Sequence, residues 1–149
     1  MKSSKNRLPG LLGLAITMLL ALGCSDSDSS PTEPEPTIDS VRIETISPAQ
    51  GTTLSAGSRV TFRARVPYTL ATASSGRISI IIEDQASRNI SSTSPQPSIQ
   101  VTRGGGVVEL ADTVTIPANG VTRVDVFVPL FPGGASNTSI VQVVRYTVQ

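Results

Sequence analysis

The chain has 149 residues, a formal net charge of +1, one cysteine and no histidine. Without histidine it lacks the usual general base near neutral pH and the commonest transition-metal ligand, which excludes Ser-His-Asp and Cys-His catalysis. A single cysteine excludes a fold held by internal disulfides. We therefore expect no cofactor, no metal site and, with so small a charge, no nucleic-acid partner.

The N-terminal 23 residues have the parts of a secretory signal. Lys2, Lys5 and Arg7 precede an uncharged segment that runs from Leu8 to Gly23. The apolar part of this segment is shorter than the roughly 20 residues that a transmembrane helix needs. A retained transmembrane anchor is therefore the weaker interpretation.

The signal ends in Leu20-Ala21-Leu22-Gly23-Cys24, which resembles the lipobox of bacterial lipoproteins. The resemblance implies that residues 1–23 are a lipoprotein signal peptide, and that the acylated Cys24 thiol holds the mature chain on a membrane. Ser25 follows the cysteine, and in the Gram-negative sorting scheme a serine there implies transfer to the outer membrane. The expected location is the bacterial envelope, on the periplasmic face or the cell surface.

Residues 24–40, the lipidated cysteine and the segment after it, form a predicted tether. Residues 25–40 hold five acidic residues and no basic residue, and they are rich in serine and proline. So few apolar side chains cannot bury enough surface to order the segment, and the prolines favour an extended chain. We expect an acidic, disordered spacer between the membrane and the domain at 41–149.

From residue 41 the hydrophobic period changes to two, which is typical of half-buried strands. The alternation predicts about seven strands, over residues 41–45, 60–68, 77–83, 99–101, 107–116, 124–130 and 140–148. Asn119-Gly120 lies between two of them and predicts a hairpin. Arg103-Gly104-Gly105-Gly106 is interpreted as a flexible loop, because the helix that follows a phosphate-binding loop is missing.

Short strands at this spacing, with no helix between them, predict an all-β antiparallel sandwich over residues 41–149. The order resembles that of immunoglobulin-like and fibronectin-III-like domains. The cysteine pair and the tryptophan of antibody domains are missing. A small up-and-down β-barrel is the alternative.

Three arginines, Arg59, Arg63 and Arg65, share the outer face of the second predicted strand. One interpretation is a solvated sheet face with cross-strand partners such as Glu83 or Asp125. The other is an anion-binding face for an acidic polysaccharide, lipid head groups or a partner protein. Arginine suits that role because its planar fork holds a carboxylate or phosphate through two hydrogen bonds.

Phe127 and Phe131 lie in the most apolar segment after the signal. If Val128 and Leu130 point inward, the two rings lie on the outer face, where they would form a contact patch for a partner. The alternative is that a neighbouring strand or loop covers them.

Carboxylates offer the remaining route to catalysis. Glu83-Asp84 is the adjacent acidic pair of the domain, but neighbours on a strand point to opposite faces, and no spacing favours calcium. Asp112 interrupts an inward apolar phase, so we expect a bulge that turns it outward or an arginine that pairs with it.

The sequence therefore favours a lipid-anchored β-sandwich with a non-enzymatic binding, adhesion or structural role, acting on another envelope protein. A binding module for acidic polysaccharides that uses the arginine face is the first alternative. A small carboxylate-dependent hydrolase is the second.

Overall fold

The computed structural model describes residues 38–149. The predicted signal peptide, Cys24 and most of the predicted tether lie outside the described residues. No helix long and apolar enough to cross a membrane is found within 38–149. This part of the chain is all-β, with seven strands: β1 (Ser40–Val41), β2 (Thr45–Ser47), β3 (Arg59–Ser79), β4 (Ile81–Asp84), β5 (Ser98–Thr115), β6 (Arg123–Pro132) and β7 (Val141–Thr147).

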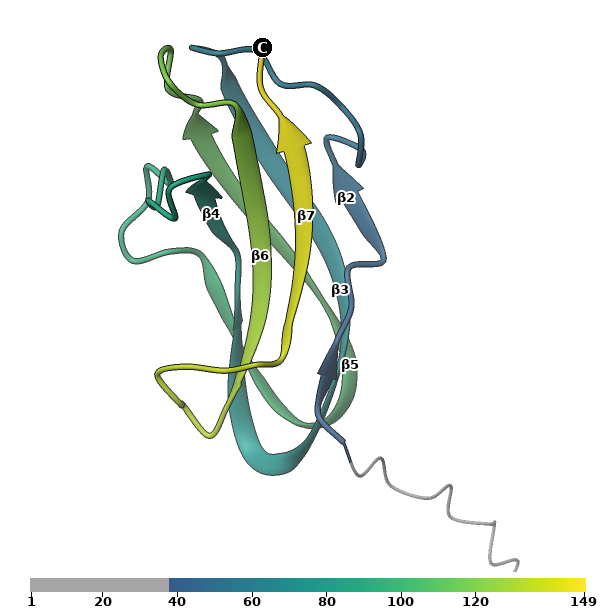
Figure 1. Cartoon of the computed structure of the whole chain (residues 1–149). Coiled ribbons are helices and arrows are strands. Elements are labelled where there is room, and N and C mark those ends of the chain that lie inside the picture. Colours follow the sequence, from purple (N-terminus) through teal and green to yellow (C-terminus); the bar gives the residue numbers. More distant parts are fainter. Residues whose placement is uncertain (1–37) are drawn as a thin grey trace, which may run out of the picture. The chain divides into compact units, whose positions relative to one another are not determined.

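The strands form two layers that are joined through one long strand (Figure 1). In the first layer β3 pairs with β5 from Arg59↔Thr115 to Ser79↔Ser98, with one irregularity between residues 70 and 75. β1 and β2 also pair with β3. In the second layer β6 pairs with β4 and β7. β3 enters this layer as well, because its Gly76–Ile78 segment pairs with β6.

These antiparallel pairings form an open seven-stranded sheet folded into two layers, which confirms the predicted all-β antiparallel sandwich. Within residues 38–149 no ladder joins β7 to β1 or β2, so the sheet is open and the alternative of a closed barrel is wrong. The seven strands differ from those predicted. The strand predicted at 41–45 is divided into β1 and β2, and those at 99–101 and 107–116 are both parts of β5.

Alternation along the strands builds the core between the layers. Alternate apolar side chains of β3 (Phe62, Ala64 and Val66) and of β6 (Val124, Val126, Val128 and Leu130) are buried, and the rings of Phe62 and Tyr146 meet at a centroid distance of 5.3 Å. Burying one such large apolar side chain stabilises the fold by about 1.5–3 kcal/mol. With no disulfide available, this packing is the main source of stability.

Two loop predictions are wrong. The three glycines at 104–106 lie inside β5, where Gly106 is opposite Tyr68 of β3. Asn119-Gly120 does not close a hairpin, because β5 pairs with β3 while β6 pairs with β4 and β7. Gly120 has a φ of 75°. Such a backbone suits a connection that crosses between layers as well as a tight hairpin, so the dipeptide alone did not distinguish them.

The sandwich begins slightly before the predicted boundary at residue 41. The Asp39 carboxylate accepts hydrogen bonds from the backbone N–H groups of Ala71 (2.6 Å) and Thr72 (2.9 Å), and from the Thr72 hydroxyl. Ser40 already belongs to β1. The last two residues of the predicted tether are therefore parts of the domain.

Candidate functional site

The three arginines of the predicted anion-binding face are exposed on the outer face of β3. Their cross-strand neighbours differ. Arg65 lies between Thr45 of β2 and Glu109 of β5, whereas Arg63 lies between Ser47 and Ala111. Register, which the sequence does not reveal, therefore gives neighbouring arginines different surroundings.

Arg65 is committed to ion pairs. Its Nε lies 2.7 Å from Glu44 Oε2, and its Nη1 lies 3.5 Å from Glu109 Oε1. All three side chains are substantially exposed, so each pair contributes at most about 1 kcal/mol to stability. The two ion pairs matter more for ligand binding than for stability, because both carboxylates already occupy donors of the Arg65 guanidinium. The prediction that Glu83 or Asp125 pairs with these arginines is wrong, since both carboxylates lie on the second layer.

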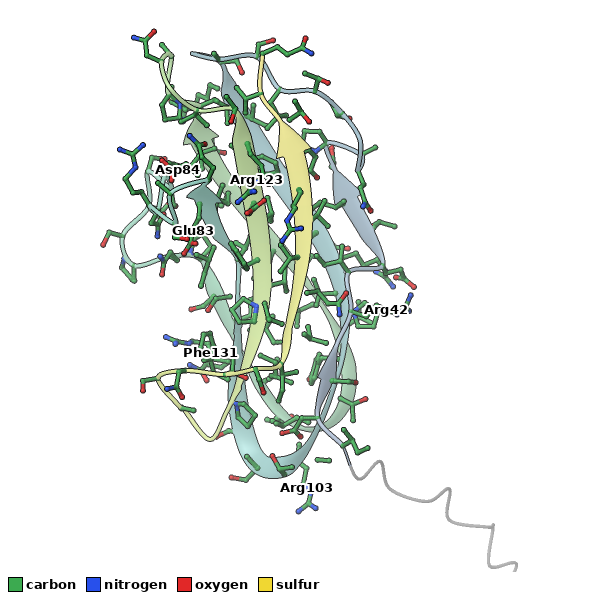
Figure 2. The ribbon with its side chains drawn as sticks, in the orientation of Figure 1. Arg42, Glu83, Asp84, Arg103, Arg123 and Phe131 are labelled. Carbon is green, nitrogen blue, oxygen red and sulfur yellow. The ribbon has the colours of Figure 1, made fainter. Side chains whose placement is uncertain are left out.

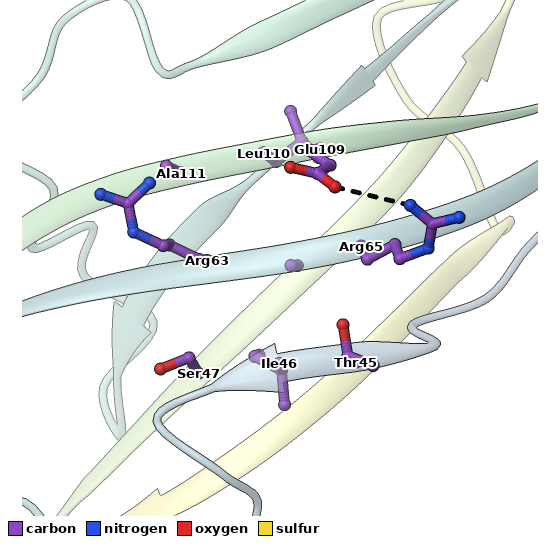
Figure 3. Close-up of a pocket in the computed structure, with 9 residues that line it drawn as sticks. Thr45, Ile46, Ser47, Arg63, Arg65, Glu109, Leu110 and Ala111 are labelled. Atoms are coloured by element: carbon purple, nitrogen blue, oxygen red, sulfur yellow. Dashed lines mark hydrogen bonds and ion pairs between the residues drawn. The ribbon is translucent and has the colours of Figure 1, made fainter.

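The side chain of Arg63 makes no ion pair or hydrogen bond with any residue of 38–149, and the same is true of the Arg59 side chain. Arg63 also lines a shallow depression of about 470 Å³ that crosses β2, β3 and β5 (Figure 3). Its strand neighbours, Ser47 and Ala111, are too small to cover it. The lining residues are Thr45, Ile46, Ser47, Arg63, Ala64, Arg65, Glu109, Leu110 and Ala111.

The depression has the chemistry of an anion site rather than that of an acid–base pair. The Arg63 guanidinium offers a planar fork of donors, and the hydroxyls of Thr45 and Ser47 line the same hollow. Glu109 is the one carboxylate among its lining residues. A mechanism with two carboxylates that flank a substrate therefore has no second group in this hollow.

The two phenylalanines of the predicted contact patch are less exposed than expected. Both rings lie on the outer face of the second layer, but Phe131 is only 8% exposed, and the Arg77 guanidinium lies 4.8 Å from its ring centroid. Phe127 is half-buried and sits in a row between Ile81 of β4 and Val143 of β7. The exposed member of this apolar row is Val143 (39% exposed).

Glu83 and Asp84 point to opposite faces, as the period of a strand predicts (Figure 2). Asp84 is buried and is held by Arg88, whose Nη2 lies 2.6 Å from Asp84 Oδ2. Glu83 faces outward beside Asp125 of β6. Burial, together with the charges of Asp125 and Asp84, raises the pKa of Glu83 above its ordinary value.

The pair of carboxylates on one face is thus Glu83 and Asp125, which sequence reasoning missed because no periodicity shows which strands are neighbours. Asp125 Oδ2 lies 3.2 Å from Arg123 Nη2, and Oδ1 lies 3.6 Å from Arg145 Nε. Oδ1 is buried and accepts no hydrogen bond. No group of three side chains able to hold a metal ion occurs in the described part of the chain.

Asp112 is buried in β5, and both predicted explanations for it are wrong. It stays in the regular β3–β5 register, opposite Phe62, so no bulge turns it outward. Its carboxylate accepts hydrogen bonds from the hydroxyls of Ser91 and Thr93 (2.9 Å for Thr93). Two hydroxyls from the loop before β5 replace the expected arginine.

Comparisons with known proteins add little to this site. No protein-family model matches the chain, and no curated protein matches it. Among solved structures it is similar to a family 123 glycoside hydrolase from Clostridium perfringens, at 7% sequence identity and a TM-score of 0.30. The match covers 74% of this chain and 26% of that chain, so this chain spans about a quarter of the hydrolase. A likeness this weak carries no argument about function.

Proposed function

We propose that this chain is a lipoprotein of the bacterial envelope whose β-sandwich binds an anionic partner and catalyses no reaction. The lipobox that ends in Cys24 supports the lipid anchor, and Ser25 supports the outer membrane as its location. The acidic segment that follows supports a domain held off the membrane surface.

The unpaired Arg63 is the observation that carries the binding role. An arginine on an exposed sheet face is stabilised by a carboxylate on a neighbouring strand, as Arg65 is by Glu109. Arg63 instead has Ser47 and Ala111 beside it, so its donors stay available to a ligand. An acidic polysaccharide fits this chemistry, because its carboxylate would take the guanidinium fork and its hydroxyls would meet Thr45 and Ser47.

The anchor is tested by metabolic labelling with palmitate in a bacterial host that processes lipoproteins. The wild-type chain incorporates label and moves to the membrane fraction, while Cys24→Ser does neither. An unlabelled wild-type chain in such a host contradicts the anchor and leaves the binding role untouched.

The binding role is tested by titration calorimetry with an oligogalacturonate and with a neutral oligosaccharide of equal length. A hydrogen bond to a charged group contributes about 1.5–3 kcal/mol, so Arg63→Gln weakens binding of the acidic sugar by about tenfold or more. Arg59→Gln is the matched control, since Arg59 lies on the same face but outside the depression. Equal affinities of wild type and Arg63→Gln, or equal affinity for both sugars, contradict the proposal.

A further inference from the structure

Strand β7 has one edge that pairs with β6 and one edge that is largely open. The N–H of Leu130 donates to the carbonyl of Ile140 (2.9 Å), and the N–H of Val148 donates to that of Thr122 (2.9 Å). These bonds show that the even-numbered residues of β7 turn their backbone groups toward β6. Since backbone groups alternate along a strand, those of the odd-numbered residues point the other way.

Among the described residues, backbone hydrogen bonds reach the outer edge of β7 only at its C-terminal end. There the N–H of Leu54 donates to the carbonyl of Thr147 (2.9 Å), and Leu54 pairs with Val148 in a parallel bridge. No residue of 38–149 makes a backbone hydrogen bond with the outward groups of Val141, Val143 or Arg145. The edge thus already accepts one short strand and stays open beside it.

The other edges of the sandwich are covered, short or interrupted by glycines. Residues 88–90 hydrogen bond to β4, and Ser91 bridges to β5 near its end. β1 and β2 are two and three residues long, and β5 carries three consecutive glycines. The open stretch of β7 reads Val-Gln-Val-Val-Arg, without proline, glycine or lysine. An unprotected edge of this kind is a template for pairing with another strand.

We propose that two copies of this chain pair through their β7 edges, antiparallel, around a two-fold axis at Val143. Val143 then faces Val143 of the second copy, and Val141 faces Arg145 of the second copy. All three residues direct their free N–H and C=O groups outward, so each facing pair exchanges two hydrogen bonds. This pairing requires that the odd-numbered residues of β7 direct their backbone groups away from β6, and they do.

Side chains favour the same register. Ile81, Phe127 and Val143 form an apolar row across β4, β6 and β7, and pairing at Val143 joins this row to its copy. The valine that is 39% exposed in the single chain becomes buried at the axis. Arg145 meets Val141 and keeps Asp125 at 3.6 Å, so no like charges stand directly opposite one another.

The proposal does not depend on Cys24 or Arg63, since Arg63 lies on the other layer. It predicts that the sheet β4-β6-β7 continues across the axis into its copy. Anchoring on a membrane would raise the local concentration and favour the pairing further.

Disulfide cross-linking tests the register directly, using the full chain with Cys24→Ser so that each variant has a single cysteine. Facing residues of a hydrogen-bonded antiparallel pair have Cα atoms about 5.5 Å apart, within the range of a disulfide. Val143→Cys is therefore expected to cross-link to its copy at least about tenfold more than Thr147→Cys. Thr147 is the matched control because it is exposed on the same strand, while the two-fold register places its copy roughly 27 Å away.

Light scattering supplies an independent measurement. The full chain with Cys24→Ser and Val143→Thr is expected to have the mass of a dimer, and Val143→Lys the mass of a monomer, because two ammonium groups would meet at the axis. Near-ultraviolet circular dichroism checks that Val143→Lys remains folded. Three results overturn the proposal: equal cross-linking of Val143→Cys and Thr147→Cys, cross-linking of Val143→Cys to a different protein only, or a monomeric wild-type mass up to about 1 mM.

Discussion

Glu83 of β4 lies directly opposite Asp125 of β6, so two carboxylates are neighbours on the outer face of the second layer. Arg123 and Arg145 lie beside Asp125 and offset part of this repulsion. Burial and the neighbouring negative charges still raise the pKa of Glu83. The ionised form of Glu83 is therefore less stable in the folded protein than in the unfolded chain.

Glu83→Gln is expected to raise the free energy of unfolding at pH 7, by up to about 1 kcal/mol for relief of a like-charge pair. The pKa of Glu83 is higher in the folded than in the unfolded state, so its penalty is present above the folded pKa. The penalty vanishes below the unfolded value of 4.5, where Glu83 is protonated in both states. Urea denaturation from pH 3.5 to 7 checks this. A difference between the two proteins that does not change with pH contradicts it.

The buried Asp112 carboxylate depends on the hydroxyls of Ser91 and Thr93. Ser91→Ala removes one donor from a buried charge and is expected to lower the free energy of unfolding by about 1–3 kcal/mol. Ser92→Ala is the control, because the exposed Ser92 hydroxyl bonds only the carbonyl of Thr113. Chemical denaturation of both variants should show the larger loss for Ser91→Ala, and the reverse order refutes this account of Asp112.

Tyr146 joins the end of the chain to the turn after β2, since its hydroxyl donates to the carbonyl of Pro48 (2.7 Å). Burial raises the pKa of Tyr146 to about 12 from its ordinary value of 10.0. Its contribution to stability is therefore complete below pH 10 and is lost as the pH rises toward the folded pKa. Tyr146→Phe should be less stable by about 1 kcal/mol at pH 7. Thermal melts should show this deficit shrinking above pH 10; a constant deficit would mean that Tyr146 does not ionise as described.

Gly106 is covered by the ring of Tyr68 on the facing strand, and a Cβ added there would lie 2.8 Å from that ring. Gly106→Ala should displace the ring and destabilise the fold by about 1 kcal/mol or more. Gly105→Ala is the control, because its nearest neighbour would be the Tyr68 carbonyl oxygen at an ordinary 3.7 Å. Denaturant midpoints compare the two variants, and the near-ultraviolet signal of tyrosine reports the ring. Equal midpoints would show that the ring moves freely.

Periodicity alone predicted which side chains of each strand face the core. It placed Arg63 on the outer face of β3, and Val128 and Leu130 in the interior, because a period of two is a local property of the strand. It misjudged the glycines at 104–106, which pair with residues 68–70 of β3 and lie partly under the Tyr68 ring. Local composition cannot report such a contact.

Strand register decides which partners a polar side chain meets, and register is not a local property of the sequence. Arg65 meets Glu109 of β5 and Glu44, which lies just before β2, whereas Arg63 has Ser47 and Ala111 beside it. The same holds for Asp112, whose hydroxyl partners come from a loop about 20 residues earlier. Sequence reasoning therefore found the candidate site as a face, but the structure was needed to show which of its arginines are paired with carboxylates.

The hydrogen bonds that the Asp39 carboxylate accepts from the backbone of Ala71 and Thr72 have a mechanical consequence for a chain anchored at its N-terminus. Any pull transmitted along the residues before it reaches the domain at Asp39, whose carboxylate is bonded to the backbone of β3. β3 pairs with members of both layers. A load on the proposed anchor is thus delivered to the strand that both layers share, instead of peeling a short edge strand away from the fold.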